Sequence, residues 1–294
     1  MNKKFQLKEL LLSSSIDGES EFFPLLSDED EQKIDKEKNP EVLPILHLRN
    51  TVLFPGVIIP ITVTRARSIK LIKEAEKNNK IIGVVSQKDS KIELPQVSDL
   101  NKIGTVAQIL KVLKMPDGNI TAVIQGRKRF ELDEMIETDP YYKAKITDYV
   151  EVKPYSDKEF DALVSSVKDL ALKIIDESPN IPNEASIAIK NIKSSSFVIN
   201  FVSSNMSISM LNKQNLLEEI DLKKRAIKVL ELLSKELQML EMKNEIQSKV
   251  RTDLDQQQRE YFLHQQMKAI QEELGGSGSG KEIEEMQSLA SKKK

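Results

Sequence analysis

Residues 215–274 read NLLEEIDLKKRAIKVLELLSKELQMLEMKNEIQSKVRTDLDQQQREYFLHQQMKAIQEEL and contain neither proline nor glycine. Leu, Glu, Lys and Gln dominate the stretch, and all four are strong helix formers. The apolar residues recur mainly at steps of three and four, which is the spacing of one face of a helix. They are Leu230, Leu233, Leu237, Leu240, Ile246, Val250, Leu254, Tyr261, Leu263, Met267, Ile270 and Leu274. The stretch therefore predicts one long helix.

A helix over this range would be roughly 90 Å long at about 1.5 Å per residue. A small domain is roughly 30 Å across, so we expect much of the helix to project. The middle of the apolar stripe steps mostly by four, so the stripe rotates around the helix instead of forming one strict heptad seam. Such a helix needs a partner along part of its length: another part of the chain, another subunit or a captured polypeptide.

Five side chains on the predicted helix are candidates for contact with a substrate or partner. They are Met239, Met242, Tyr261, Phe262 and Met267. Methionine suits contacts with many partners because its side chain is flexible and polarizable. Ordinary packing against a helical domain or a neighbour is the competing interpretation, and it fits each residue alone slightly better. A small domain cannot bury the whole stripe, however, so the contact hypothesis stands.

The composition of the chain excludes several classes of protein. Its 294 residues are 39% hydrophobic, 31% charged and 5% aromatic, with a net charge of -2. That balance creates no global positive field for nucleic acid. The lack of cysteine excludes disulfides, thiolate metal sites and a cysteine nucleophile. No apolar run approaches the roughly 18 residues of a membrane span, and the N-terminus is a poor signal peptide, so we expect a soluble, cytoplasmic protein with no membrane partner.

The chain divides into five regions. Residues 1–40 are acidic and predict a disordered leader, because few apolar side chains are available to offset the entropy of ordering. Residues 41–153 predict a β-rich domain, residues 154–214 a small helical domain, and residues 215–274 the long helix. Residues 275–294 begin with the flexible linker GGSGSG and continue into a short polar helix. With no closing element after it, the chain looks cut rather than finished.

The β-rich domain shows short β-branched runs separated by turn residues. The turn PDGN at residues 116–119 joins two of these runs as a hairpin. Pro60 confines another run to an edge, bulge or strand start. The predicted strands are residues 42–48, 57–63, 80–86, 103–115, 120–130 and 141–152, with an amphipathic helix at 67–78. Helices at 157–177, 182–192 and 194–204 follow, so the fold class is α+β.

Patterns that could carry catalysis are weak. Residues 275–281 have the spacing of a phosphate loop, but Glu282 stands where Ser or Thr would hold magnesium, and a helix rather than a strand comes before. His47 and His264 have no accompanying cluster of ligands, so His47 is predicted to be a structural residue at a strand end. No serine lies in a Gly-x-Ser-x-Gly elbow. We therefore predict no catalytic, cofactor-binding or metal-binding residue in this chain.

Four segments share a more specific pattern. Residues 43–56 read LPILHLRNTVLFPG, residues 103–107 read IGTVA, and residues 216–225 read LLEEIDLKKR. Residues 258–275 contain QREYFL and QMKAIQEELG. Together these segments resemble the N-terminal region of Lon proteases, and the last segment is the most specific. The resemblance covers about residues 41–294, with the acidic leader outside it.

The resemblance implies a PUA-like β-rich domain, a small helical bundle and one very long projecting α-helix. In the family these parts lead into an ATPase module, which uses ATP and magnesium, and a protease domain with a Ser-Lys dyad. This chain holds neither a complete phosphate loop nor the dyad segment, so we expect the chain alone not to be an enzyme. The role that carries over is capture of unfolded, damaged and short-lived regulatory proteins in protein quality control and the stress response. The resemblance also implies that the chain helps to hold together a ring of subunits, usually a hexamer.

Two other functions compete with this one. A non-proteolytic adaptor or scaffold could use the same domain, and the missing modules motivate that alternative. A nucleic-acid binder rests on the PUA-like fold and the basic residues 127–129, but fold does not carry function. Those residues lack interleaved aromatic side chains, so a solvated loop is the favoured interpretation. We therefore expect polypeptide and subunit partners rather than nucleic acid.

Overall fold

The computed structural model describes residues 34, 36–93, 95–115, 118–178, 181, 184–273 and 288. The chain forms two compact units, Met1–Gln238 and Met239–Lys294. Most of the predicted acidic leader lies outside the described residues, as do the predicted linker and nearly all of the polar helix after it. The first two residues of the predicted hairpin turn, Pro116 and Asp117, also lie outside them.

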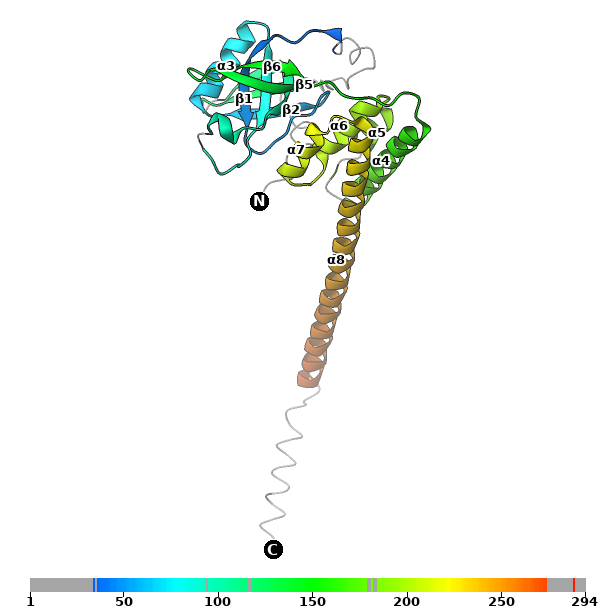
Figure 1. Cartoon of the computed structure of the whole chain (residues 1–294). Helices are drawn as coiled ribbons and strands as arrows, with labels where there is room; N and C mark the ends of the chain where they lie inside the picture. Colours follow the sequence, from blue (N-terminus) through cyan, green and yellow to red (C-terminus); the bar gives the residue numbers. More distant parts are fainter. Residues whose placement is uncertain are drawn as a thin grey trace. The chain divides into compact units, whose positions relative to one another are not determined.

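Within the described part of the first unit, six strands form one mixed sheet (Figure 1). They are β1 (Val42–Leu48), β2 (Ile58–Val63), β3 (Ile81–Ser86), β4 (Ile103–Lys114), β5 (Ile120–Glu137) and β6 (Lys143–Asp148). The strand order is β2-β5-β4-β3-β1-β6, and β5 also pairs with β6. This extra pairing closes a barrel, with β2 attached to β5. The pair β1–β3 is parallel, and the other pairs are antiparallel.

The length of β5 makes the closure possible. This strand has 18 residues and continues to Glu137, beyond the predicted end. Its first part pairs with β2 and β4, and its second part pairs with β4 and then β6. Register shifts in the β4–β5 and β5–β6 pairs are β-bulges or irregularities. Because bulges bend a strand and increase its twist, β5 can curve from one side of the barrel to the other.

The barrel core forms around Phe130 on β5, which is fully buried. The ring of Phe130 approaches glycines on β3 and β4. A Cβ atom added to Gly83 or Gly104 would lie 3.1 Å or 2.9 Å from the Cζ atom of Phe130. The atom added to Gly83 would lie closer still to Cδ1 of Ile45, at 2.6 Å, and the atom added to Gly104 would lie closer still to the carbonyl oxygen of Val84, so neither position has room for a larger residue. The other buried residues of the cluster are Leu43, Ile45, Val85, Leu100, Val106, Ala144 and Ile146.

Helix α3 (Ala66–Lys77) packs against β1 and β4, and η1 (Val97–Asp99) is a short 3₁₀ turn between β3 and β4. The apolar residues that α3 buries are Leu71, Ile72 and Ala75. They lie on one face of the helix, which is the amphipathic pattern that predicted a helix here.

In the described part of the first unit, four helices lie between the barrel and the long helix: α4 (Lys158–Asp176), α5 (Glu184–Asn191), α6 (Ser195–Asn205) and α7 (Met210–Glu218). Polar side chains define where three of them begin. Asp157, Ser194 and Ser209 each accept a hydrogen bond from a backbone N–H in the first turn of α4, α6 and α7, respectively. The three helices predicted in this region are present as α4, α5 and α6, whereas α7 was not predicted as a separate helix.

The prediction that the long helix begins at residue 215 is wrong. Helix α7 ends at Glu218, and the long helix, α8, spans Leu222–Glu273. The residues between the two helices form backbone hydrogen bonds with the segment that follows β6. The Val152 N–H donates to the Ile220 carbonyl at 3.0 Å, and the Val152 carbonyl accepts from the first residue of α8 at 3.1 Å. Tertiary hydrogen bonds thus interrupt a stretch whose composition favours helix throughout.

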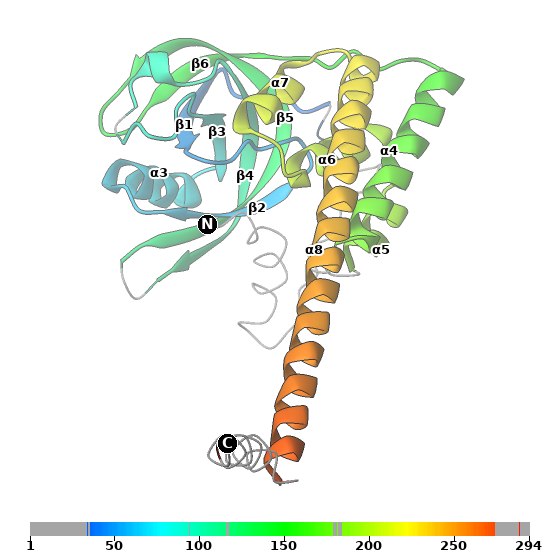
Figure 2. The ribbon, with the colours of Figure 1, turned by 90° about the horizontal axis from the view of Figure 1, so that it is seen from below.

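The first part of α8, up to Gln238, belongs to the first unit. Its buried apolar residues recur at steps of three and four, so they form one face of the helix. They are Leu222, Ala226, Val229, Leu233 and Leu237. Figure 2 shows this part of α8 beside α4 and α6. The face closes the core of the helical part of the first unit.

The remainder of α8, residues 239–273, belongs to the second unit. None of the described residues of this unit is buried. Its exposed large apolar residues are Met239, Met242, Ile246, Val250, Leu254, Tyr261, Phe262, Leu263, Met267 and Ile270. The same helix therefore contains a covered apolar face in one unit and an exposed apolar surface in the other.

We expect Leu233→Ala to lower the free energy of unfolding by about 2–5 kcal/mol, because it removes a buried side chain and leaves a cavity. Leu233 is 2% exposed, whereas Leu254, on the same helix, is 53% exposed. The matched control Leu254→Ala should change the free energy by less than about 0.5 kcal/mol. Urea unfolding followed by circular dichroism at low protein concentration measures both. Equal losses would contradict the burial difference between the two parts of α8.

Candidate functional site

The five predicted contact residues all lie on α8 in the second unit. Met239, Met242, Tyr261, Phe262 and Met267 each expose between 51% and 68% of their surface. They are therefore accessible in the isolated chain. Their contact with a substrate or partner remains a prediction.

These side chains do not share one face of α8. At about 100° per residue, the exposed apolar residues of the second unit fall mainly on two faces about a third of a turn apart. The first face contains Met239, Met242, Ile246, Val250, Leu254 and Tyr261, and the second contains Leu263, Met267 and Ile270. Phe262 lies outside both. The apolar surface therefore winds around the helix, as the stepping of the sequence predicted.

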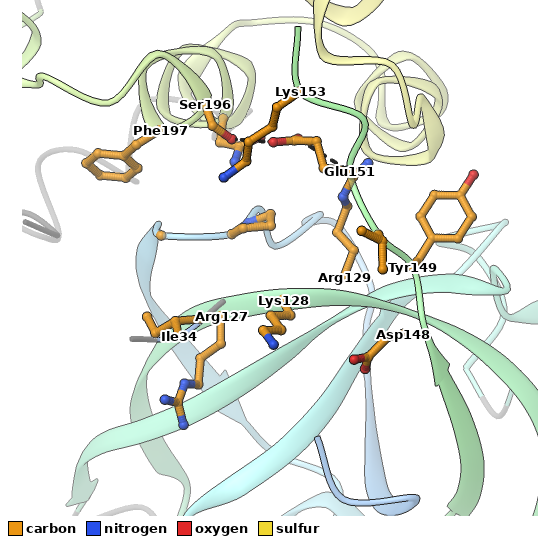
Figure 3. Close-up of a pocket in the computed structure, with 14 residues that line it drawn as sticks. Ile34, Arg127, Lys128, Arg129, Asp148, Tyr149, Glu151, Lys153, Ser196 and Phe197 are labelled. Carbon is orange, nitrogen blue, oxygen red and sulfur yellow. Dashed lines mark hydrogen bonds and ion pairs between the residues drawn. The ribbon is translucent and has the colours of Figure 1, made fainter. Parts of the chain in front are cut away.

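A second candidate site is a pocket of about 310 Å³ in the first unit, between the barrel and α6 (Figure 3). Arg127 and Lys128 on β5, Lys153 after β6 and Phe197 on α6 contribute to its lining. The turn before β2 also contributes. Gly56 has φ +79° there, and a Cβ atom at this position would lie 2.6 Å from Cδ2 of Phe197. Glycine permits both the left-handed turn and the close approach of α6.

A carboxylate at this pocket binds two buried arginines. The Glu151 Oε2 atom lies 3.2 Å from Nη2 of Arg129 on β5 and 2.7 Å from Nη1 of Arg225 on α8. The two arginine side chains are 2% and 0% exposed. The Ser196 hydroxyl on α6 donates to the other carboxylate oxygen at 2.7 Å. One carboxylate therefore connects the barrel, α6 and α8.

The remaining arginine donors reach the break between α7 and α8. Arg129 Nη1 donates to the carbonyls of Leu217 and Glu219 at 3.0 Å and 2.9 Å. Arg225 Nε donates to the same Glu219 carbonyl at 3.1 Å, and Arg225 Nη1 donates to Asn200 Oδ1 at 3.2 Å. The last carbonyls of a helix have no partner within the helix. These arginines supply partners for them.

Burial, and to a lesser extent the nearby Arg225 cation, lowers the pKa of Arg129 to about 10. Glu151 acts in the opposite direction. Arg129 therefore remains protonated at neutral pH, and one carboxylate faces two cations. Removal of that carboxylate would leave two buried charges without their shared counter-charge, which is costly.

The interpretation of residues 127–129 as a solvated loop is wrong. They lie within β5, and the side chain of Arg129 is almost completely buried. Its carboxylate partner lies 22 positions away, and its carbonyl acceptors lie about 90 positions away. No local pattern marks such an arginine, because its partners come together only in the folded chain.

His47, near the end of β1, has the structural role that its position predicted. Its Nε2 atom contacts Nη1 of Arg65, and its ring centroid lies 6.0 Å from that of Tyr142. Burial, and to a lesser extent the charge of Arg65, lowers the pKa of His47 from 6.5 to about 4. His47 is therefore neutral at pH 7, and Nε2 can accept a hydrogen bond. His264 is exposed on α8 in the second unit.

The described residues show neither a metal site nor a membrane span. They contain no group of three or more His, Cys, Asp or Glu side chains that could hold a metal ion. None of the helices in the described part of the chain is both long and apolar enough to cross a membrane.

Residues 42–235 match the family model of the ATP-dependent protease La (LON) substrate-binding domain. The chain belongs to the Lon substrate-binding domain family. The match begins with β1 and ends within the first part of α8. The Lon domain thus includes the barrel, helices α3 to α7 and the arginine–carboxylate cluster around Glu151. The family resemblance inferred from the sequence is confirmed.

Curated relatives from two organisms are Lon proteases. The relative from Flavobacterium johnsoniae is 57% identical over 294 residues, which is 100% of this chain and 36% of that protein. The relative from Cytophaga hutchinsonii is 48% identical over 275 residues, which is 93% of this chain and 34% of that protein. This Lon-family chain therefore spans about a third of the length of these relatives.

A solved structure also resembles the Lon-family fold described above. It is the N-terminal domain of Mycobacterium avium complex Lon protease, with a TM-score of 0.54 and 19% identity. The likeness covers 66% of this chain and 98% of that one. At this identity it supports the α+β fold alone.

We expect Glu151→Gln to lower the free energy of unfolding by about 3 kcal/mol, because Arg129 and Arg225 would stay buried without their shared carboxylate. Glu245→Gln is the matched control: its i,i+4 ion pair with Lys249 is exposed and should contribute less than about 0.5 kcal/mol. Urea unfolding at pH 7 measures both variants. A loss no larger than that of the control would show that Glu151 does not hold the cluster together.

Stability should fall as the pH decreases from about 6.5 to about 4, because unfolded His47 binds a proton that folded His47 excludes. At about 1.4 kcal/mol per pKa unit, His47 contributes up to about 3 kcal/mol to this loss. His47→Gln should therefore flatten the dependence of the free energy of unfolding on pH. The exposed His264→Gln variant is the control and should retain the slope. Urea titrations at pH 7.0, 6.0 and 5.0 test this, and unchanged slopes in both variants would contradict it.

Proposed function

We propose that this chain recognises unfolded and damaged polypeptides, and short-lived regulatory proteins, for an ATP-dependent serine protease of the Lon family. The observation that carries the proposal is the match of residues 42–235 to a substrate-binding domain. The Lon protease relatives are about three times as long as this chain. We assign the ATPase module, with its ATP and magnesium, and the Ser-Lys protease domain to the part of the protein that this chain does not span. The chain itself binds polypeptide and catalyses no reaction.

The apolar surface of α8 in the second unit offers a physical basis for capture. Unfolded proteins expose apolar side chains that native proteins bury. Met239, Met242 and Met267 can adapt to different partners because their side chains are flexible. Tyr261 and Phe262 add large aromatic contact areas. A surface of this kind discriminates by the amount of exposed apolar area rather than by one fixed sequence.

Contacts between subunits are the second part of the proposal. We assign to the full-length protein a ring of subunits, a hexamer, in the cytoplasm. Monomeric soluble proteins rarely expose large contiguous apolar patches. The two faces of α8 expose nine large apolar side chains, so part of this surface is available to neighbouring subunits. A cytoplasmic location agrees with a sequence that contains no cysteine, because disulfides are rare in that compartment.

The test of capture is fluorescence anisotropy with a labelled small protein, either native or reduced and alkylated so that it stays unfolded. We expect this chain to bind the unfolded form at least about tenfold more tightly. The triple variant Met239→Ser, Met242→Ser and Tyr261→Ser should lose about tenfold in affinity, because about 1.4 kcal/mol of apolar contact corresponds to that factor. Tyr155→Ser is the control, since Tyr155 is 98% exposed outside α8.

Two results distinguish an error in the proposed function from an error in the proposed binding site. Equal binding of native and unfolded protein would contradict the proposed function. Selective binding that survives in the triple variant would support the function and would remove the α8 surface from the capture site. Circular dichroism of each variant shows whether the helix content is unchanged.

A further inference from the structure

The segment that precedes β1 lies against the pocket between the barrel and α6. The Glu37 carboxylate pairs with the guanidinium of Arg127 on β5, and Lys128 Nζ donates to the Glu37 carbonyl. Asn39 Nδ2 donates to Asp148 Oδ1 at 2.6 Å, at the end of β6. We call residues 36–39 the strap. Its contacts show that the pocket can receive a carboxylate and a backbone carbonyl of a peptide segment.

The side chain of Ile34, just before the strap, is part of the pocket lining. Figure 3 shows Ile34 close to Arg127, with Phe197 of α6 in the same view. Pro55 adds a second apolar contact surface to the lining. The pocket therefore combines a cationic edge with an apolar wall. A peptide with an acidic residue close to an apolar residue matches both.

The charge of the pocket favours an anionic ligand. Its cationic side chains are Arg127, Lys128, Arg129 and Lys153, and its carboxylates are Asp148 and Glu151. The carboxylate of Glu151 is already shared by two buried arginines. The lining thus carries an excess of positive charge in a protein whose net charge is slightly negative. In a partly buried site such an excess attracts carboxylates more strongly than it does in open solvent.

The contact with the strap is only partly shielded from solvent. The Arg127 side chain is 18% exposed, but that of Glu37 is 58% exposed. An ion pair with one exposed partner contributes little net stability. A carboxylate from another peptide can therefore replace Glu37 without unfolding the barrel.

We propose that this pocket binds an acidic segment of a polypeptide, and that the strap is an internal competitor for it. An Asp or Glu side chain of the bound segment takes the place of Glu37 on Arg127 and Lys128. A neighbouring apolar residue takes the place of Ile34 against Pro55 and Phe197. The site lies in the first unit and does not depend on the α8 surface, so it would add preference for acidic sequences to capture by apolar contact.

A peptide fits the pocket better than a nucleic acid does. The strap presents carboxylate and amide groups, which are the groups of a peptide. A nucleic-acid strand carries a phosphate at every nucleotide and so places more negative charge beside Asp148 and Glu151 than a peptide with carboxylates at intervals does.

The probe for the test is a fluorescein-labelled peptide that copies residues 28–39, DEDEQKIDKEKN. A second peptide has every Asp and Glu replaced by Asn and Gln. A single-stranded 12-nucleotide DNA is the third probe. All three are titrated by anisotropy with the full chain at low salt and again at higher salt, because attraction between charges weakens as ionic strength rises.

Three full-length variants define the site. Glu37→Gln should bind the acidic peptide several-fold more tightly than the wild type, because the internal competitor loses its charge. Adding Arg127→Ala to Glu37→Gln should weaken binding about tenfold, the effect of losing one charge-assisted hydrogen bond. Adding Arg67→Ala instead should leave the affinity of Glu37→Gln unchanged. Arg67 is an exposed cation on α3 whose guanidinium lies 4.0 Å from the exposed carboxylate of Asp139.

Several results would overturn the proposal. Binding of the amide peptide as tight as that of the acidic peptide would show that charge is not recognised. Equal affinity of the wild type and Glu37→Gln would show that the strap does not compete. Tighter binding of the DNA than of the peptide would assign the pocket to phosphate instead. The triple α8 variant should bind the acidic peptide as the wild type does, so failure of this proposal is distinguishable from failure of the proposed function.

Discussion

The first unit depends on one carboxylate that two buried arginines share. Glu151 lies on the segment that leaves the barrel, and it binds Arg129 from β5, Arg225 from α8 and the Ser196 hydroxyl from α6. Each guanidinium also donates to the Glu219 carbonyl where α7 ends. Two cations can stay buried only if these partners are in place together. The cluster therefore specifies how the barrel, α6 and the start of α8 are joined.

Helix α8 shows how one sequence pattern can serve two purposes. In the first unit its apolar residues form a covered face, and in the second unit they remain exposed. The amphipathic spacing of apolar residues indicates that one face of a helix is suited to apolar contact, but it does not identify the partner in that contact. In the first part the contact is supplied by the chain itself. In the second part these side chains are exposed, and they are the surface that we propose for capture or assembly.

Much of the fold could be predicted because its signals are local. The β-branched runs mark the strands, and Asp157 and Ser194 mark the starts of two predicted helices through hydrogen bonds within a single turn. The separate helix α7 was not predicted, although Ser209 caps it in the same way. The five contact residues on α8 could be named from methionine and aromatic content, although their role remains a prediction. The charged pocket beside Phe197 could not be found, because its lining comes from β5, α6 and the segments after β1 and β6. The burial of Arg129 was missed for the same reason.

By itself, the sequence determined the type and order of the elements, the long helix and the Lon family, because composition, spacing and short motifs carry that information locally. Only the tertiary structure decided where the long helix begins, since the pairing of Val152 with the α7–α8 break overrides helix propensity. It also decided that β5 closes a barrel and that Arg129 is buried beside Glu151. These features depend on hydrogen bonds and ion pairs between residues far apart in the chain, and such contacts leave no periodic trace in the sequence.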